Sequence, residues 1–116
     1  MATRSRIAVE LPNGKVKSVY CHWDGYPDGV GRDLLNMGFN STDEVEEFIN
    51  EGDRSTVELS YKAWRNEDCP PLEHDSVSSF FNGDIEEYGY LYTTKGEWIV
   101  KDSYGGLEKS LTNQIS

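Results

Sequence analysis

Three side chains near the end of the first β-rich segment have the right types and spacing for acid–base chemistry. Tyr20, His22 and Asp24 alternate along the chain, so in a β-strand they point to the same side. A histidine beside a carboxylate is the minimum for general-base catalysis. A hydrolase also needs a nucleophile, but the adjacent Cys21 points to the opposite face, where His22 cannot activate it. We therefore name no catalytic residue and expect His22 to hydrogen-bond the next loop or to contact a partner.

Cysteine and histidine are too sparse to predict a metal site. The chain has two of each, Cys21, Cys69, His22 and His74. The Cys69–His74 spacing suits zinc, but neighbouring strand residues diverge, so Cys21 and His22 cannot easily reach one tetrahedral ion. We predict no metal, no other cofactor and two free thiols.

A loop punctuated by glycine and proline, Gly25–Gly31, follows this strand and precedes a helix. Phosphate-binding loops have the same order, but their consensus sequences are missing here, and Asp24 and Asp28 would repel an anion. We expect a rigid turn that presents a recognition surface including Tyr26. Three of its residues are candidates for positive backbone φ, namely Gly25, Gly29 and Gly31.

The segment Ser18–Gly31 also concentrates rare residue types, among them one of the two cysteines and one of the three tryptophans. Its sequence SVYCHWDGYPDGVG, preceded by TRSRI at Thr3–Ile7, resembles the signature of a family of small uncharacterised bacteriophage and prophage proteins. The close likeness is confined to the N-terminal third of the chain. It implies an accessory protein that engages a host or rival-defence protein rather than a virion component.

The net charge is −10 and is unevenly distributed. Residues 1–32 carry five basic and three acidic side chains, a balance of +2, whereas residues 33–116 carry six basic and eighteen acidic ones, a balance of −12. Such a field repels nucleic acid and membrane phosphates. We therefore predict no direct nucleic-acid binding and no membrane binding. The expected partner is a basic surface of a host or defence protein.

Three groups of side chains are candidates for partner contact. The first lies on the strand and loop just described, Tyr20, His22, Asp24 and Tyr26. The second is the acidic, solvent-facing side of a helix over residues 42–50 and the turn after it, Asp43, Glu46, Glu47 and Glu51. The third is Tyr90 and Tyr92, which we expect to form an exposed ladder with Tyr88. Such a ladder suits a partner contact or a homodimer.

A β-hairpin is expected near each end of the chain. Between Arg6–Leu11 and Val16–Trp23, the pair Asn13-Gly14 predicts a type I′ turn. That register pairs Ile7 with Tyr20. It places Val9, Val16 and Tyr20 on the face of Ile7, and Val19 and Cys21 on the other, although a one-residue bulge would exchange the two sets. The second hairpin joins residues 88–93 to 97–101, with the tyrosines facing away from Leu91, Trp98 and Val100.

Short helices are expected over residues 32–37, 42–50 and 75–81. Gly38 is the expected end of the first, Ser41 and Glu44 form a capping box at the start of the second, and Asp75 is the expected cap of the third. The stretch 53–84 is otherwise the least defined, with residues 57–64 slightly favouring a strand. The predicted core consists of Val9, Val45, Phe48, Ile49, Leu91, Trp98 and Val100.

These elements predict a single α+β domain over residues 1–116. Its antiparallel sheet is built from the two hairpins, and the short helices pack mainly on one face. We interpret the chain as a small acidic, non-enzymatic binding protein of the cytoplasm, which is the host cytoplasm if a phage encodes it. One alternative is an enzyme or ligand-binding module that uses the Tyr20, His22 and Asp24 face with the glycine loop. Another is a self-associating structural protein.

Overall fold

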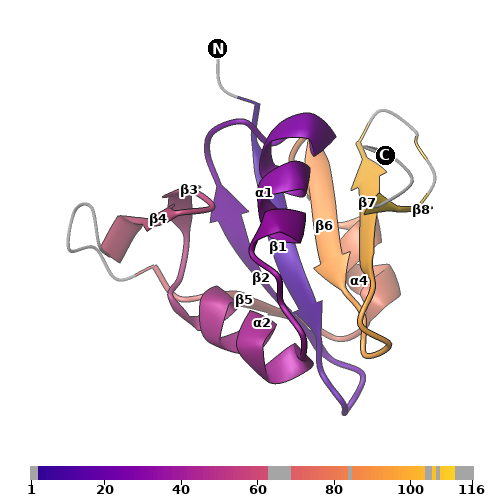
Figure 1. The fold of residues 1–116 in the computed structure, drawn as a ribbon. Helices are drawn as coiled ribbons and strands as arrows, with labels where there is room; N and C mark the ends of the chain where they lie inside the picture. The colour runs from indigo at the N-terminus through magenta and orange to yellow at the C-terminus, as the bar shows by residue number, and fades with distance from the viewer. Residues whose placement is uncertain (1–2, 63–68, 84, 104–105, 107, 112–116) are drawn as a thin grey trace.

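The protein is built around one mixed β-sheet, seen in a computed structural model that describes residues 3–62, 69–83, 85–103, 106 and 108–111 (Figure 1). The strands follow the order β4-β3-β2-β1-β6-β7-β8, and β5 pairs with β2 beside that path. Their bounds are β1 Ser5–Glu10, β2 Val16–Cys21, β3 Arg54–Thr56, β4 Leu59–Ser60, β5 Leu72–His74, β6 Tyr88–Tyr92, β7 Trp98–Asp102 and β8 Lys109–Ser110. The predicted α+β class is confirmed.

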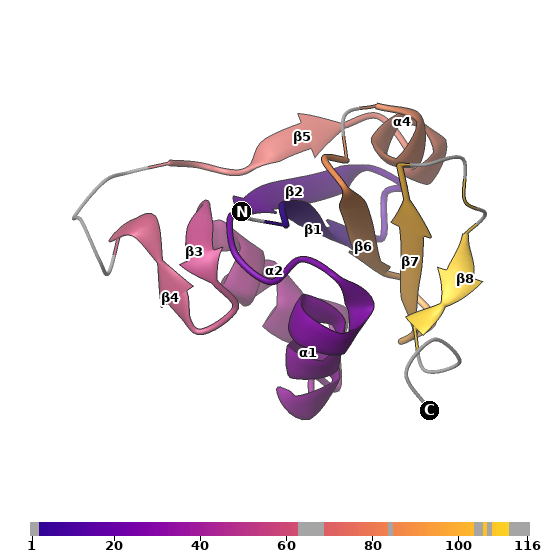
Figure 2. The same cartoon turned by 90° about the horizontal axis from the view of Figure 1, so that it is seen from above.

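Short helices cover both faces of the sheet. They are α1 (Arg32–Asn36), which follows a π-helical turn over Pro27–Gly31, α2 (Thr42–Asn50) and α4 (Val77–Asn82). Figure 2 shows α1 and α2 on one face and α4 with β5 on the other. The expected packing mainly on one face therefore describes the first two helices and not the third.

The caps of α2 and α4 illustrate how short polar residues set helix starts. The Ser41 hydroxyl accepts from the Glu44 N–H at 3.2 Å, as expected, but the Glu44 carboxylate accepts from the N–H of Asn40 and not from that of Ser41. Helix α4 is capped by Ser76, whose hydroxyl accepts from the Ser79 N–H at 3.1 Å, and not by Asp75. A serine in extended conformation can satisfy an amide that the helix leaves free.

The sheet is mixed because its two hairpins join side by side in parallel. Strand β1 pairs with β6 in parallel, so that Ile7 lies opposite Tyr90, and β2 pairs with β3 in parallel. The expected sheet was wholly antiparallel. Helices α1 and α2 form the connection between β2 and β3, and a chain that crosses one face of a sheet can return parallel to the strand it left.

The turn of the first hairpin differs from the expected type I′ turn. The Leu11 carbonyl accepts from the Gly14 N–H at 2.9 Å, and the Leu11 N–H donates to the Lys15 carbonyl at 2.8 Å. Gly14 has φ +87°, whereas Asn13 is not in the left-handed region. This is a type I turn followed by a glycine bulge, and it suits Pro12 at its first corner because proline holds φ near the required value.

The bulge shifts the pairing of β1 and β2 by one residue. Ile7 lies opposite Val19 instead of Tyr20. Val19 and Cys21 therefore join the face of Ile7, while Val16 and Tyr20 turn to the other side. The expected distribution of these side chains between the two faces is reversed for the whole of β2, because strand side chains alternate with a period of two.

The second hairpin uses the same turn, and its tyrosines are consequently buried. Gly96 has φ +83°, its N–H donates to the Thr93 carbonyl at 3.0 Å, and Tyr92 lies opposite Trp98. Tyr90 and Tyr92 thus share a face with Trp98, and their exposed fractions are 0% and 3%. The expected exposed tyrosine ladder is wrong for both residues.

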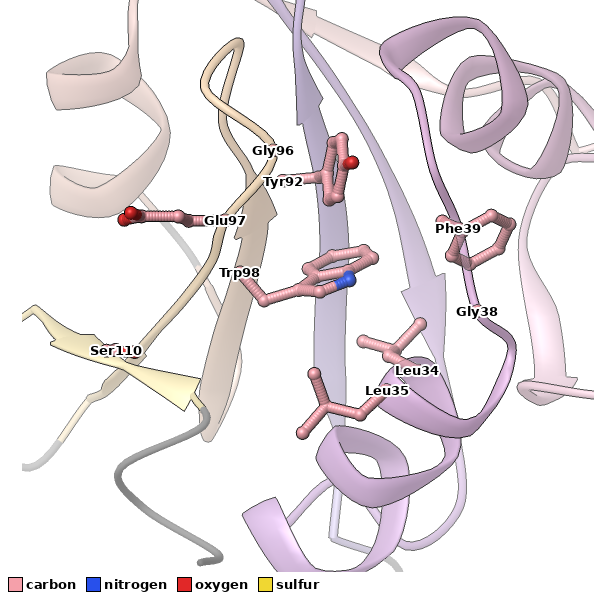
Figure 3. Close-up of a pocket in the computed structure, with 9 residues that line it drawn as sticks. All are labelled: Leu34, Leu35, Gly38, Phe39, Tyr92, Gly96, Glu97, Trp98 and Ser110. Atoms are coloured by element: carbon pink, nitrogen blue, oxygen red, sulfur yellow. The ribbon is translucent and has the colours of Figure 1, made fainter.

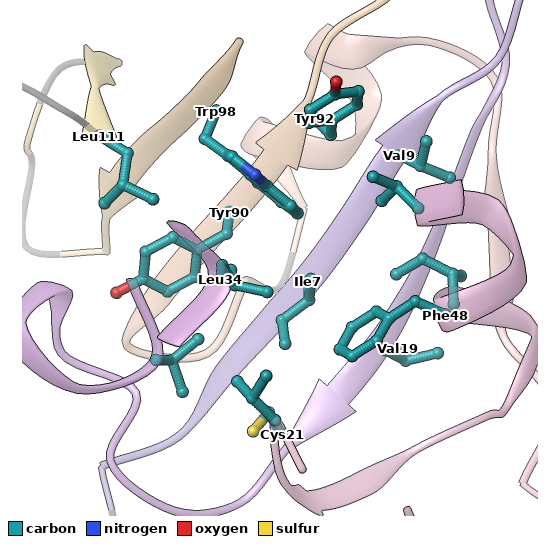
Figure 4. Packing of buried hydrophobic residues seen from close by; sticks show 14 of the residues in the cluster. Ile7, Val9, Val19, Cys21, Leu34, Phe48, Tyr90, Tyr92, Trp98 and Leu111 are labelled. Carbon is teal, nitrogen blue, oxygen red and sulfur yellow. The ribbon is translucent and has the colours of Figure 1, made fainter. Parts of the chain in front are cut away.

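Two apolar clusters enclose the central strands. All seven predicted core residues are buried, Val9, Val45, Phe48, Ile49, Leu91, Trp98 and Val100. The larger cluster lies between the sheet and helices α1 and α2 (Figure 4). The smaller one packs Ala8, Val16 and Leu91 against Phe80 and Phe81 of α4. A central strand that is buried on both faces has a continuous run of apolar residues in its sequence, as β1 has at residues 7–9.

Candidate functional site

His22 contacts Tyr20 where β2 ends. The Tyr20 hydroxyl and His22 Nδ1 are 2.6 Å apart, and the His22 ring packs edge-on against Trp23 with ring centroids 4.8 Å apart. Burial raises the pKa of Tyr20. This neutral phenol therefore stays protonated and can hold the orientation of the half-buried imidazole.

Asp24 does not join them. It adopts φ +58°, its carbonyl accepts from the Val30 N–H at 2.7 Å, and its carboxylate accepts from the Tyr26 hydroxyl at 3.3 Å. Within the described chain no hydrogen bond links Asp24 to His22. The expected alignment holds for Tyr20 and His22 but not for Asp24, because the strand ends at Cys21 and the left-handed residue redirects the backbone.

The glycine loop is rigid for a reason other than positive φ, since none of its three glycines lies in the left-handed region. A β-carbon on Gly25 would come within 2.8 Å of the Thr3 carbonyl oxygen. A β-carbon on Gly29 would overlap the carbonyl oxygen of Asp24. The Tyr90 hydroxyl also donates to the Gly25 carbonyl at 2.6 Å from the sheet below. Close backbone packing, and not turn geometry, demands glycine here.

Two aromatic side chains stand out from this rigid base. Trp23 is 44% exposed and Tyr26 is 41% exposed. Large aromatic side chains in such positions are typical of contact surfaces. We name the surface formed by Trp23, Asp24, Tyr26, Asp33 and Glu58 the loop surface.

The carboxylates of the loop surface affect one another. Partial burial, then the charges of Glu58 and Asp24, raise the pKa of the Asp33 carboxyl. In the described chain none of the three carboxylates forms an ion pair, whereas the neighbouring Asp28 pairs with Arg32 at 2.5 Å. The site thus carries negative charge that no internal cation offsets.

Sequence reasoning assigned only Asp24 and Tyr26 of this surface to a site. Trp23 belongs to the same Ser18–Gly31 signature, and the rarity of tryptophan in the chain could have marked it as a site residue. Asp33 and Glu58 gave no comparable signal. Glu58 comes from the turn between β3 and β4, a stretch whose structure the sequence left undefined.

The four predicted acidic residues of α2 and the turn after it fall into two classes. Glu46 pairs with Lys17 at 3.0 Å and is only partly exposed, and Glu51 pairs with Arg54 at 3.2 Å. Asp43 and Glu47 are exposed and form no ion pair within the described residues. The predicted acidic face exists, but half of the four predicted residues serve internal contacts.

The cysteine and histidine residues do not assemble into a site. Cys21 is fully buried, and burial raises its pKa to about 12, so its thiol is inert at neutral pH. His74 instead contacts the Ser18 hydroxyl, with Nε2 and Oγ 2.7 Å apart. Among the residues that the structure describes, no group of three potential metal ligands lies together.

Comparison with known proteins assigns no function to the site. No protein-family model matches the chain, and neither a curated protein nor a solved structure gives a match. In the described part of the chain, no helix has the length and apolar character needed to cross a membrane.

Proposed function

We propose that this protein is a non-enzymatic binding protein that engages a basic protein surface, with the loop surface as its principal contact. One observation carries the proposal. Two exposed aromatic side chains, Trp23 and Tyr26, stand within four residues of each other among carboxylates that lack an internal cation. Aromatic anchors beside uncompensated charge are typical of interface hot spots.

The electrostatics of Asp33 support a cationic partner. Its raised pKa reflects burial and the repulsion of Glu58 and Asp24. A lysine or arginine placed among these carboxylates would relieve that repulsion. Its charge would also lie within reach of the aromatic ring faces of Trp23 and Tyr26, which attract cations.

Helix α2 has a supporting role. Two exposed acids of this helix, Asp43 and Glu47, form no ion pair with any described residue and extend the negative field beyond the loop surface. Complementary fields of this kind accelerate association more than they tighten the final complex. The net charge of −10 should likewise accelerate association with a basic partner.

The geometry favours binding over the alternative of an enzyme. His22 hydrogen-bonds Tyr20, and no carboxylate of the described residues contacts it, so the general-base arrangement is not assembled among them. The alternative of self-association rested on the tyrosine ladder, but Tyr90 and Tyr92 are buried and Tyr88 is only partly exposed. The likeness to phage proteins adds the proposal that the partner belongs to the host or to a defence system.

The test is capture from a bacterial lysate followed by measurement of the captured protein against purified variants. Trp23→Ala and the double variant Asp33→Asn, Glu58→Gln should each weaken binding at least tenfold, as expected for hot-spot residues. The association rate should fall steadily as salt rises from about 0.05 to 0.5 M, because the Debye length shortens to a few ångströms.

Matched controls lie elsewhere on the surface. Leu72→Ala removes the side chain of an exposed residue of β5, which lies on the opposite face from α1, and should leave the affinity unchanged. Asp43→Asn with Glu47→Gln should slow association and leave the dissociation rate unchanged. Equal binding by wild type and Trp23→Ala, or affinity that is constant in high salt, would contradict the proposal.

A further inference from the structure

A cleft of about 430 Å³ lies on the helix α1 side of the sheet (Figure 3). One wall comes from α1 and the segment after it, with Leu35 and Phe39. The other comes from the second hairpin, with Tyr92 and Trp98, and Ser110 of β8 lies at the margin. Clefts of roughly 300–1,000 Å³ accommodate small molecules.

Two polar groups on side chains of this cleft form no hydrogen bond with any residue that the structure describes. Tyr92 is 3% exposed and Trp98 is 7% exposed, yet no hydrogen bond involves the Tyr92 hydroxyl or the Trp98 indole N–H within the described residues. Neither atom is sealed off, since Ser5 Oγ is the one fully enclosed side-chain polar atom without a partner in that part of the chain. Both atoms therefore keep some access from outside the protein, and the side chains that carry them line the cleft.

Tyr90 provides a contrast, because its hydroxyl does have a hydrogen-bond partner in the protein. Tyr90 lies two residues before Tyr92 on the same strand and is completely buried, and its hydroxyl donates to the Gly25 carbonyl at 2.6 Å. Nine-tenths or more of buried polar groups in native proteins are paired in this way. The donors at Tyr92 and Trp98, which form no such bond within the described residues, are thus available to an external acceptor.

The rest of the cleft limits the chemistry of that acceptor. The rings of Phe39 and Trp98 lie with centroids 6.2 Å apart at 53°, and Leu35 adds aliphatic surface. Glu97 is the one charged residue among the described residues that line the cleft, and in Figure 3 its carboxylate points away from the Trp98 ring. A charged group would lose its hydration there without an ionic partner.

We propose that this cleft binds an uncharged small molecule in which a planar apolar ring carries a carbonyl or amide group. The ring packs against Phe39 and Leu35, the carbonyl oxygen accepts from the Trp98 indole N–H, and the Tyr92 hydroxyl forms the second hydrogen bond. None of the residues that line this cleft belongs to the loop surface, and the proposal does not depend on the function proposed above.

Benzamide is a suitable probe, followed by two-dimensional NMR of the ¹⁵N-labelled protein. Of the three tryptophan indole signals, the one that disappears in Trp98→Phe identifies Trp98. Benzamide should shift this signal in a saturable manner and in the direction expected for a stronger hydrogen bond. Benzoate, which is charged, and acetamide, which lacks a ring, should each bind at least tenfold more weakly.

Tyr92→Phe provides the decisive variant because it removes a hydroxyl that no protein group uses. Its thermal unfolding midpoint should equal that of the wild type, while benzamide binding should weaken about tenfold, the effect of one lost hydrogen bond. Tyr90→Phe is the matched control: it should lower the unfolding midpoint and leave benzamide binding unchanged. Benzamide shifts that never saturate, equal binding of benzoate, or full binding by Tyr92→Phe would overturn the proposal.

Discussion

At the scale of single residues, the contacts of Arg54 explain how the end of α2 is fixed to the sheet. The guanidinium is 3% exposed, donates to the carbonyls of Thr56 at 3.0 Å and Val57 at 2.8 Å, and lies 4.1 Å from the centroid of the Phe48 ring. Burial lowers its pKa, but a guanidinium remains charged in proteins. A planar group with several donors is required, because no other side chain can serve these acceptors at once.

Arg54→Lys should therefore be costly despite the retained charge. We expect the free energy of unfolding, measured by urea denaturation, to fall by about 2–4 kcal/mol, because buried carbonyls lose their donors. Glu51→Gln removes only the exposed partner of Arg54 and should cost less than about 1 kcal/mol. If the two variants cost the same, the guanidinium contacts do not determine stability here.

At the scale of elements, β5 is held to β2 by a small polar group. Val16 lies opposite His74 in the pairing of the two strands. The Ser18 hydroxyl accepts from Arg6 Nε at 3.0 Å and contacts His74 Nε2 at 2.7 Å, while the imidazole packs edge-on against Phe80. Burial, followed by the positive charge of Arg6, lowers the pKa of His74. The exposed neighbours Glu73 and Asp75 do not reverse this direction.

The attachment of β5 should consequently weaken in acid. A lowered pKa in the folded state means that the unfolded chain binds the proton more readily, so the contribution of neutral His74 is complete above pH 6.5 or so, the unfolded value. It declines as the pH falls from there toward the folded pKa. Unfolding free energies between pH 8 and pH 5 should show a loss in the wild type that is smaller in His74→Gln.

The control for this prediction is the other histidine. His22→Gln should keep the full pH dependence, because His22 contacts neither Ser18 nor Arg6. An identical pH profile for His74→Gln and the wild type would show that His74 does not couple to folding.

At the scale of the whole molecule, the net charge of −10 lowers the stability of the folded state. The four ion pairs within the described chain each join one positive and one negative charge, so they leave this excess of negative charge unchanged. Excess charge of one sign destabilises a compact state through self-repulsion. Dissolved salt screens that repulsion over distances beyond about 8–10 Å at physiological ionic strength.

The thermal unfolding midpoint should therefore rise as sodium chloride increases from about 0.02 to 0.5 M. The double variant Asp43→Asn, Glu47→Gln carries two fewer charges at exposed positions. It should be more stable than the wild type at low salt and show a smaller increase with salt. A midpoint that falls with salt would mean that attractive pairs outweigh the repulsion.

Local signals in the sequence determined most of the elements. Helix α2 occupies its predicted residues because the Ser41 cap, the Val45–Phe48–Ile49 stripe and Gly52 all act within one or two turns. Both hairpins were recognisable from alternation and glycine-containing turns. The predicted core is buried because apolar periodicity reports burial whichever face a strand presents.

Only the tertiary structure decided register, strand neighbours and the composition of the candidate sites. A single bulge residue at Gly14 or Gly96 reverses the faces of a whole strand, and the local sequence fits both turn types. The parallel contact of β1 with β6 joins segments more than 80 residues apart, which no local pattern encodes. For the same reason Glu58 reaches Asp33, and Tyr92 lies in a cleft and not on the surface. Sequence determines which side chains are available, and long-range packing determines which of them meet.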